Sequence, residues 1–263
     1  MKHDENNFKG YKDFNIYYQR WLPEGKIKAA LMIAHGYAEH SGRYMNVVKY
    51  FVPKGYAVYA LDHRGHGRSD GKIDEVGDFA NFITDLKTFF DLIRKENPDD
   101  KIFLIGHSMG SVISLLYTLE YQHELAGLAT SGGGIAKPGD PPMPPRPANQ
   151  PLDSSRLSRD PEVIKAYDND PLVYRGPIPS SMSSGMSSRT RQISEEVAKI
   201  KLPVLIMGGD GGADGARSQV LYDYIGSEDK TLKRYEGLMH EIFNEPEHLM
   251  VMADLETFLE AHL

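Results

Sequence analysis

The strongest constraint on the fold is a short apolar stretch that leads into a serine flanked by glycines. Residues 102–105 read Ile-Phe-Leu-Ile, and residues 106–110 read Gly-His-Ser-Met-Gly. Apolar residues at helical spacing follow over residues 112–119. The order of strand, G-x-S-x-G and helix predicts a sharp turn, in which glycines let the backbone segments approach and the serine is exposed as a nucleophile.

Similar apolar stretches recur along the chain and alternate with helical patterns. Such runs suit strands that are buried on both faces of a parallel sheet. The expected strands are residues 29–34, 57–61, 102–105, 125–130, 204–207 and 231–235, and the expected helices lie at 79–93, 112–119 and 249–263. The first twenty residues alternate loosely and predict antiparallel edge strands. We therefore expect an α/β fold whose mostly parallel sheet carries helices on both faces.

Residues 135–200 interrupt this alternation, because no convincing strand lies among them. Residues 137–151 are dense in proline, residues 178–188 are rich in serine, and a short helix is expected between 160 and 174. The stretch is either a long disordered loop or a small cap inserted into the fold. We favour the cap, with residues 1–134 and 201–263 as the two parts of the core. Its apolar residues would line a pocket for an acyl chain: Met143, Ile164, Leu172, Val173, Ile178, Met182 and Met186.

The composition excludes several classes of function. The chain has 263 residues, a formal net charge of −7 and no cysteine, so disulfides, thiolate metal sites and cysteine catalysis are absent. A mildly acidic chain without a basic block is a poor partner for nucleic acid. The first ten residues are polar, and no apolar run approaches the ~18 residues of a membrane span. We expect a cytoplasmic protein, and oligomeric state is left open.

A serine hydroxyl is a weak nucleophile that needs a base, and in G-x-S-x-G hydrolases the acid and then the histidine follow the serine in the chain. The histidines after the motif are His123, His240, His248 and His262. Three of them fall on expected helices that read as surface or face away from the turn. His240 lies in the expected loop between the sixth strand and the last helix, and it is the predicted base.

Two aspartates compete for the acid that orients this imidazole. Both follow the strand at residues 204–207, in the glycine-rich segment 208–215. Asp210 is closer to the end of the strand, where the sheet fixes geometry best, whereas Asp214 has a longer glycine tether. The prediction is Asp210.

An oxyanion needs two N–H donors, which this motif takes from the residue after the nucleophile and from the turn after the first parallel strand. Those residues are Met109 and Tyr37. The segment 62–69, Asp-His-Arg-Gly-His-Gly-Arg-Ser, is interpreted as a tight turn whose charged groups tie loops together. No metal and no cofactor are expected.

Three segments together resemble the monoacylglycerol lipase family of α/β-hydrolases, which is also described as lysophospholipase-like. They are residues 35–44 (HGYAEHSGRY), 62–69 (DHRGHGRS) and 106–110 (GHSMG), and residues 229–237 extend the likeness towards His240. The resemblance implies an α/β-hydrolase fold with a small inserted cap. Residues 135–200 look shorter than the usual cap of this family, which leaves the substrate preference open.

Carried over residue by residue, the resemblance implies Ser108 as nucleophile, Asp210 as acid and His240 as base, with Tyr37 and Met109 as oxyanion donors. A second aspartate four residues after the acid is common in the family, and Asp214 reproduces it. Glu39 and Arg43 align with polar residues that face the glycerol end of the substrate in some members. A salt-bridged loop explains these two residues equally well.

The expected function is cleavage of carboxylic esters, above all monoacylglycerols, through an acyl-enzyme. A broader carboxylesterase or lipase, a thioesterase and an acyltransferase would use the same residues, since a fold does not determine a substrate. A binding protein without activity would lack a member of the triad, and candidates for all three are present. The expected partner is a small ester, with a transient contact between the cap and lipid surfaces.

Overall fold

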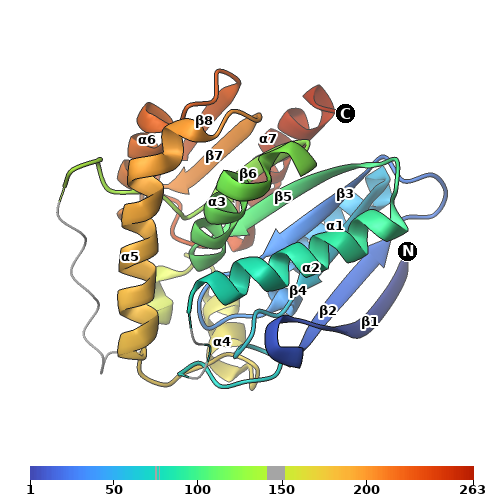
Figure 1. Cartoon of the computed structure of the whole chain (residues 1–263), viewed down its shortest axis with the longest axis horizontal. Coiled ribbons are helices and arrows are strands. Elements are labelled where there is room, and N and C mark those ends of the chain that lie inside the picture. The colour runs from blue at the N-terminus through green and yellow to red at the C-terminus, as the bar shows by residue number, and fades with distance from the viewer. Residues whose placement is uncertain (75, 77, 141–151) are drawn as a thin grey trace.

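A computed structural model describes residues 1–74, 76, 78–140 and 152–263. In these residues the strands form one eight-stranded sheet in the order β1-β2-β4-β3-β5-β6-β7-β8 (Figure 1). The strands are β1 Lys2–Lys9, β2 Asn15–Leu22, β3 Ala29–Ala34, β4 Tyr56–Leu61, β5 Lys101–His107, β6 Gly127–Ser131, β7 Val204–Gly209 and β8 Lys230–Tyr235. From β4 to β8 all neighbours are parallel, and β1 and β2 form the antiparallel edge. The predicted α/β-hydrolase architecture is confirmed.

Helices cover both faces of this sheet. They are α1 Met45–Phe51, α2 Ala80–Glu96, α3 Met109–Tyr121, α4 Pro161–Asn169, α5 Ser180–Glu196, α6 Asp214–Tyr224 and α7 His248–Ala261. Short 3₁₀ turns lie at Tyr11–Asp13, Ser41–Tyr44, Val52–Lys54, Gln122–Glu124, Ser154–Arg156, Val197–Lys199 and Ile242–Asn244. No helix in the described part of the chain is both long enough and apolar enough to cross a bilayer.

The continuous apolar runs of the central strands follow from burial on both faces. In β3, Ala30 and Met32 belong to the core cluster that includes residues of α2, α3, α5 and α6, while Leu31 and Ile33 belong to the cluster with α1 and α7. Successive side chains of a strand point to opposite faces, so both sets must be apolar. This arrangement brings the carboxyl ends of the parallel strands, and the loops that follow them, to one edge of the sheet.

The described residues between β6 and β7 contain no strand, as predicted. The expected short helix is α4, which starts with Pro161 in its first turn and is capped by Asp160, whose carboxylate accepts a hydrogen bond from the N–H of Glu162 at 2.9 Å. Most of the proline-rich stretch, including Met143, lies outside the described residues. Division of the chain into core and cap at residues 135 and 200 stays a prediction.

The serine-rich stretch belongs to α5, and a disordered loop is therefore wrong for residues 180–196 (Figure 1). Serine has a modest helix propensity, but Met182 and Ile193 are buried in the main core cluster and Met186 packs against it. Packing of this apolar face against the protein stabilises a helix that local propensity does not indicate.

Candidate active site

Ser108 sits at the strained junction between β5 and α3. Its backbone has φ 53° and ψ −116°, a conformation that costs a non-glycine residue about 1–3 kcal/mol and persists only where neighbours hold it. The N–H of Ser108 donates to the carbonyl of Ser131 at 2.8 Å, and its own carbonyl accepts from Ser111 at 3.0 Å. The nucleophile turn is thus fixed to β6 on one side and to its own helix on the other.

The two glycines of the motif are required by close packing. A Cβ at Gly110 would lie 2.0 Å from the carbonyl oxygen of Ala34, at the end of β3. A Cβ at Gly106 would lie 2.5 Å from Oγ of Ser114 and 2.6 Å from the carbonyl oxygen of Gly110. These contacts confirm the reason given for the spacing of G-x-S-x-G.

His240 lies beside this turn, in the loop after β8. Its ring is 4.8 Å from the ring of His107, the residue before Ser108, measured between centroids. Gly132, directly after β6 and with φ 60°, lies against both rings, since a Cβ there would be 3.1 Å from each. The predicted base and the predicted nucleophile are therefore brought to the same place.

The acid that contacts His240 is Asp214, and the prediction of Asp210 for this contact is wrong. Oδ2 of Asp214 lies 2.7 Å from Nδ1 of His240. Asp210 instead accepts a hydrogen bond from the N–H of Gly237 at 2.9 Å and lies 3.5 Å from the guanidinium of Arg234. Its carboxylate thus faces the edge of the sheet, where its side chain is 29% exposed, against 13% for Asp214.

Backbone packing explains why the nearer aspartate turns away. The N–H of Gly211 donates to the carbonyl of Leu238 at 2.9 Å, and a Cβ at Gly209 would lie 2.2 Å from the same oxygen. The loop after β7 therefore runs directly along the backbone of the histidine loop. Its glycines allow this path, and α6 then begins at Asp214, whose side chain reaches the imidazole from the first turn.

The surroundings of His240 favour its protonated form. Burial alone would lower the pKa of this imidazole, but the hydrogen bond and the negative charge of Asp214 outweigh it. Glu241 and Glu39 add to this effect, and the pKa of His240 is raised above its ordinary value. An imidazole held this way can accept a proton from a hydroxyl and remain stable as a cation.

The two predicted oxyanion donors flank Ser108. Met109 is the first residue of α3, where an N–H has no acceptor within the helix. Tyr37 follows Gly36, and a Cβ at Gly36 would lie 3.1 Å from Cβ of Ser108. The turn after β3 therefore packs directly against Ser108, and the assignment of Tyr37 and Met109 as oxyanion donors stays a prediction.

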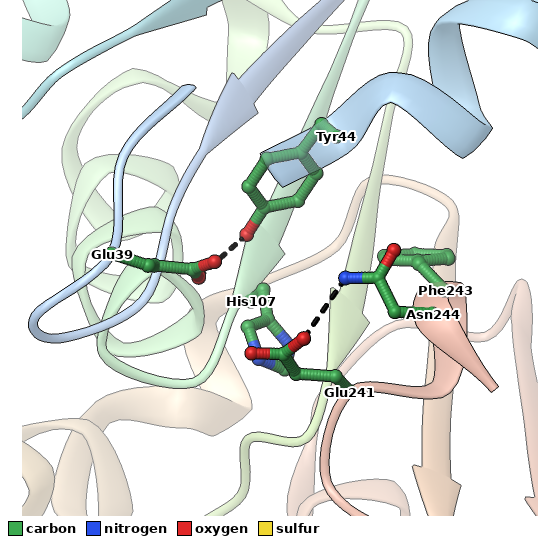
Figure 2. A pocket seen from close by; sticks show the side chains of 6 residues that line it. All are labelled: Glu39, Tyr44, His107, Glu241, Phe243 and Asn244. Carbon is green, nitrogen blue, oxygen red and sulfur yellow. Dashed lines mark hydrogen bonds between the residues drawn. The ribbon is translucent and has the colours of Figure 1, made fainter. Parts of the chain in front are cut away.

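Glu39 and Arg43 are buried in an ion-pair cluster. Nη2 of Arg43 lies 2.6 Å from Glu241, and its Nε lies 3.6 Å from Glu39. Glu39 also accepts hydrogen bonds from Tyr44 at 2.9 Å (Figure 2) and from the N–H of Gly36. Burial and the charge of Glu241 raise the pKa of Glu39 to about 7. The sequence did not point to Glu241, because a glutamate after a histidine carries no recognisable pattern.

A small polar cavity opens against this cluster, next to His107 (Figure 2). Its volume, counted as the space that the centre of a water molecule can occupy, is about 10 Å³. The lining residues are Glu39, Tyr44, His107, Glu241, Phe243 and Asn244. That volume suits a single water molecule. Arg43 does not line this cavity and is held by its ion pairs with Glu241 and Glu39. Contact of Glu39 and Arg43 with a substrate stays a prediction.

The segment 62–69 ties loops together, as interpreted from the sequence. The carboxylate of Asp62 accepts hydrogen bonds from the N–H groups of Ser41 at 2.7 Å and Arg68 at 2.8 Å. The buried guanidinium of Arg64 binds Asp85 at 2.6 Å. No group of three or more histidine, aspartate and glutamate side chains among the described residues is placed to hold a metal ion.

The fold, with a serine in the strand-to-helix turn after β5, is that of a serine hydrolase of the α/β-hydrolase class. Residues 25–247 match the family described as "Serine aminopeptidase, S33". The chain is 36% identical to a monoacylglycerol lipase of Mycolicibacterium smegmatis, covering 98% of both chains. It is 31% identical to human monoglyceride lipase, covering 88% of this chain and 81% of the relative. The monoacylglycerol lipase of Paleococcus ferrophilus superposes with a TM-score of 0.77 at 28% identity, covering 94% of this chain and 99% of that one.

The chain therefore belongs to the monoacylglycerol lipase-like family of α/β-hydrolases, and the predicted resemblance is confirmed. Its class is carboxylic ester hydrolase, since its relatives and structural neighbours are named as lipases and esterases.

Proposed function

We propose that the protein hydrolyses monoacylglycerols and similar esters of one acyl chain through an acyl-enzyme on Ser108. The observation that carries the proposal is the 2.7 Å contact between His240 and Asp214, beside a serine held at φ 53°. Nucleophile, base and orienting acid in one cluster are the requirement for covalent ester hydrolysis.

In the proposed mechanism, Oγ of Ser108 attacks the ester carbonyl carbon while Nε2 of His240 takes the hydroxyl proton. Asp214, in place of the expected Asp210, accepts from Nδ1 and stabilises the imidazolium. The carbonyl oxygen becomes an oxyanion that receives hydrogen bonds from the N–H groups of Tyr37 and Met109. The intermediate then expels the alcohol, which receives the proton from His240, and leaves an acyl group on Ser108.

In the second half of the cycle, water takes the place of the alcohol. His240 removes a proton from the water, which attacks the acyl carbonyl and releases the fatty acid, and the proton returns to Ser108. An alcohol acceptor in place of water would make the protein an acyltransferase with the same residues.

In the proposal, apolar residues between β6 and β7 form the acyl pocket. Two of them, Ile178 and Met182, belong to the large core cluster of the protein, which also contains Met109. Methionine adapts to flexible chains, and each methylene of a tail buried there gains about 0.8 kcal/mol. A triacylglycerol would need room for two further chains. Among the described residues, the exposed large apolar side chains, such as Leu249 and Met250, lie outside the cap. Contact between the cap and a lipid surface therefore stays a prediction.

The test compares one acyl group in different esters. Purified protein is given octanoyl monoacylglycerol, octanoyl triacylglycerol, p-nitrophenyl octanoate and an octanoyl thioester, with S108A as the control for background hydrolysis. We expect kcat/KM for the monoacylglycerol and the p-nitrophenyl ester to exceed that for the triacylglycerol at least about tenfold. Equal rates on the triacylglycerol would contradict the roofed pocket, and a preference for the thioester would replace the proposed substrate class.

A further inference from the structure

The turn that carries the proposed donor Tyr37 is held by the imidazole of His35. Nδ1 of His35 lies 2.7 Å from the carbonyl oxygen of Gly36. Nε2 of the same ring lies 2.8 Å from the backbone nitrogen of His63. Because a backbone N–H can only donate, Nε2 must be the unprotonated acceptor, and the ring proton must therefore be on Nδ1. The geometry thus defines one neutral tautomer, which donates to Gly36 and accepts from His63.

This hydrogen bond determines where the N–H of Tyr37 points. The carbonyl of Gly36 and the N–H of Tyr37 belong to one planar trans peptide unit, so they point in opposite directions. A donor that fixes the carbonyl on one side therefore fixes the N–H on the other. The preceding peptide unit is held as well, because the N–H of Gly36 donates to Glu39.

The ring of His35 is itself immobilised by its neighbours. It is fully buried, with ring centroids 4.4 Å from His63 and 5.4 Å from His66. Burial and the neighbouring rings lower the pKa of His35 well below its ordinary value, and burial lowers those of His63 and His66 to about 3 and 4. The lowered pKa values favour the neutral form of all three imidazoles, in which Nδ1 of His35 donates to Gly36.

We infer that His35 is a positioning residue for the ester hydrolysis proposed above, which aims the N–H of Tyr37 at the oxyanion through the Gly36–Tyr37 peptide unit. The inference rests on the proposed function. Removing one oxyanion donor costs about 10²–10³ in kcat, so misdirecting a donor that is still present should cost about 10- to 100-fold.

Two substitutions of His35 separate the contribution of its Nδ1 contact from that of its Nε2 contact. Nδ2 of an asparagine occupies the position of Nδ1, so H35N keeps a donor for Gly36 and loses the contact with His63. The amide of a glutamine occupies the position of Nε2, so H35Q can accept from His63 and loses the donor for Gly36. Both variants bury one amide in place of one imidazole, which makes them matched controls for stability.

The measurement is the ratio of kcat/KM for an ester to that for the matching thionoester, in which sulfur replaces the carbonyl oxygen. Sulfur is a weak acceptor and gains little from an oxyanion hole. We expect kcat of H35Q on the ester to fall 10- to 100-fold with KM little changed, and the ester-to-thionoester ratio to fall about tenfold. H35N should keep the ratio within a few-fold of the wild type. Rates are divided by the concentration of active sites titrated with an organophosphate.

A purely structural role for His35 would lower ester and thionoester rates equally, and an unchanged ratio in H35Q would overturn the inference. Should H35Q fail to fold, ¹⁵N NMR of the wild-type histidines at pH 7 decides: a His35 signal with Nε2 protonated would contradict the proposed donor. Failure of the proposed function would be recognised separately, because the wild type would then neither cleave esters nor be labelled on Ser108.

Discussion

The turn after β5 and the loop after β7 each deliver one member of the proposed triad, but they hold it by different means. Ser108 stands at φ 53° between two glycines that have no room for a side chain. Asp214 lies at the end of a run of residues that includes Gly212, where an added Cβ would meet nothing within 4 Å. The turn at Ser108 has no room at either glycine, whereas the loop after β7 is closely packed at Gly209 and Gly211 and open at Gly212. In that loop two aspartates compete, and long-range backbone contacts choose between them.

The largest effect should follow from removing the hydroxyl group of Ser108 in the turn after β5. We expect S108A to lower kcat for ester cleavage by a factor on the order of 10⁶, because the covalent route is lost. Circular dichroism should show the fold unchanged. An organophosphate should label Ser108 in the wild type, and mass spectrometry that places the adduct on another serine would refute the assignment.

The second region is tested by comparing its two aspartates. D214N should lower kcat by about 10⁴, since an amide favours the wrong tautomer of His240. D210N keeps an oxygen that can accept from the N–H of Gly237 and loses the charge of the partly exposed ion pair with Arg234, which should cost no more than about tenfold. Equal losses in both variants would mean that the loop as a whole, and not the contact with His240, orients the base.

The two regions also differ in how well the sequence predicts them. The nucleophile turn, the parallel sheet and His240 follow from local signals, namely apolar runs, glycine spacing and the order of elements along the chain. The choice of Asp214 does not follow from local signals, because it depends on the hydrogen bond from Gly211 to Leu238, which joins the loops after β7 and β8. Nor does α5, since packing of Met182 and Ile193 on the core overrides the serines between them.

Alanine substitutions of one glycine in each region should change the free energy of unfolding by different amounts. G110A would place a Cβ 2.0 Å from the carbonyl oxygen of Ala34, and we expect it to lower the free energy of unfolding by about 1–3 kcal/mol. The gain in helix propensity, about 1 kcal/mol, is too small to offset this contact in a turn that cannot move. G212A meets no atom and should change stability by no more than about 0.5 kcal/mol.

Urea denaturation of the wild type, G110A and G212A gives this comparison directly, and a G110A variant as stable as the wild type would show that the nucleophile turn can relax. G212A serves as the matched control because it adds the same methyl group to the loop after β7.

The smallest effect concerns the pH at which His240 becomes a base. Only the neutral imidazole can accept the proton of Ser108, so kcat/KM should fall about tenfold for each pH unit below the pKa of His240. Because Asp214 raises this pKa, the fall should begin above the ordinary value of about 6.5. In D214N the raising hydrogen bond and charge are gone while burial remains, so the pKa should drop. The pKa of His240 can be followed by NMR titration of its ring, which does not depend on the slow turnover of this variant.

D210N is the control for this titration. It should leave the pKa of His240 near that of the wild type, since Asp210 does not contact the imidazole. A D210N titration that shifts as far as that of D214N would show that the loop after β7 acts on His240 through its overall charge, and the distinction between its two aspartates would be lost.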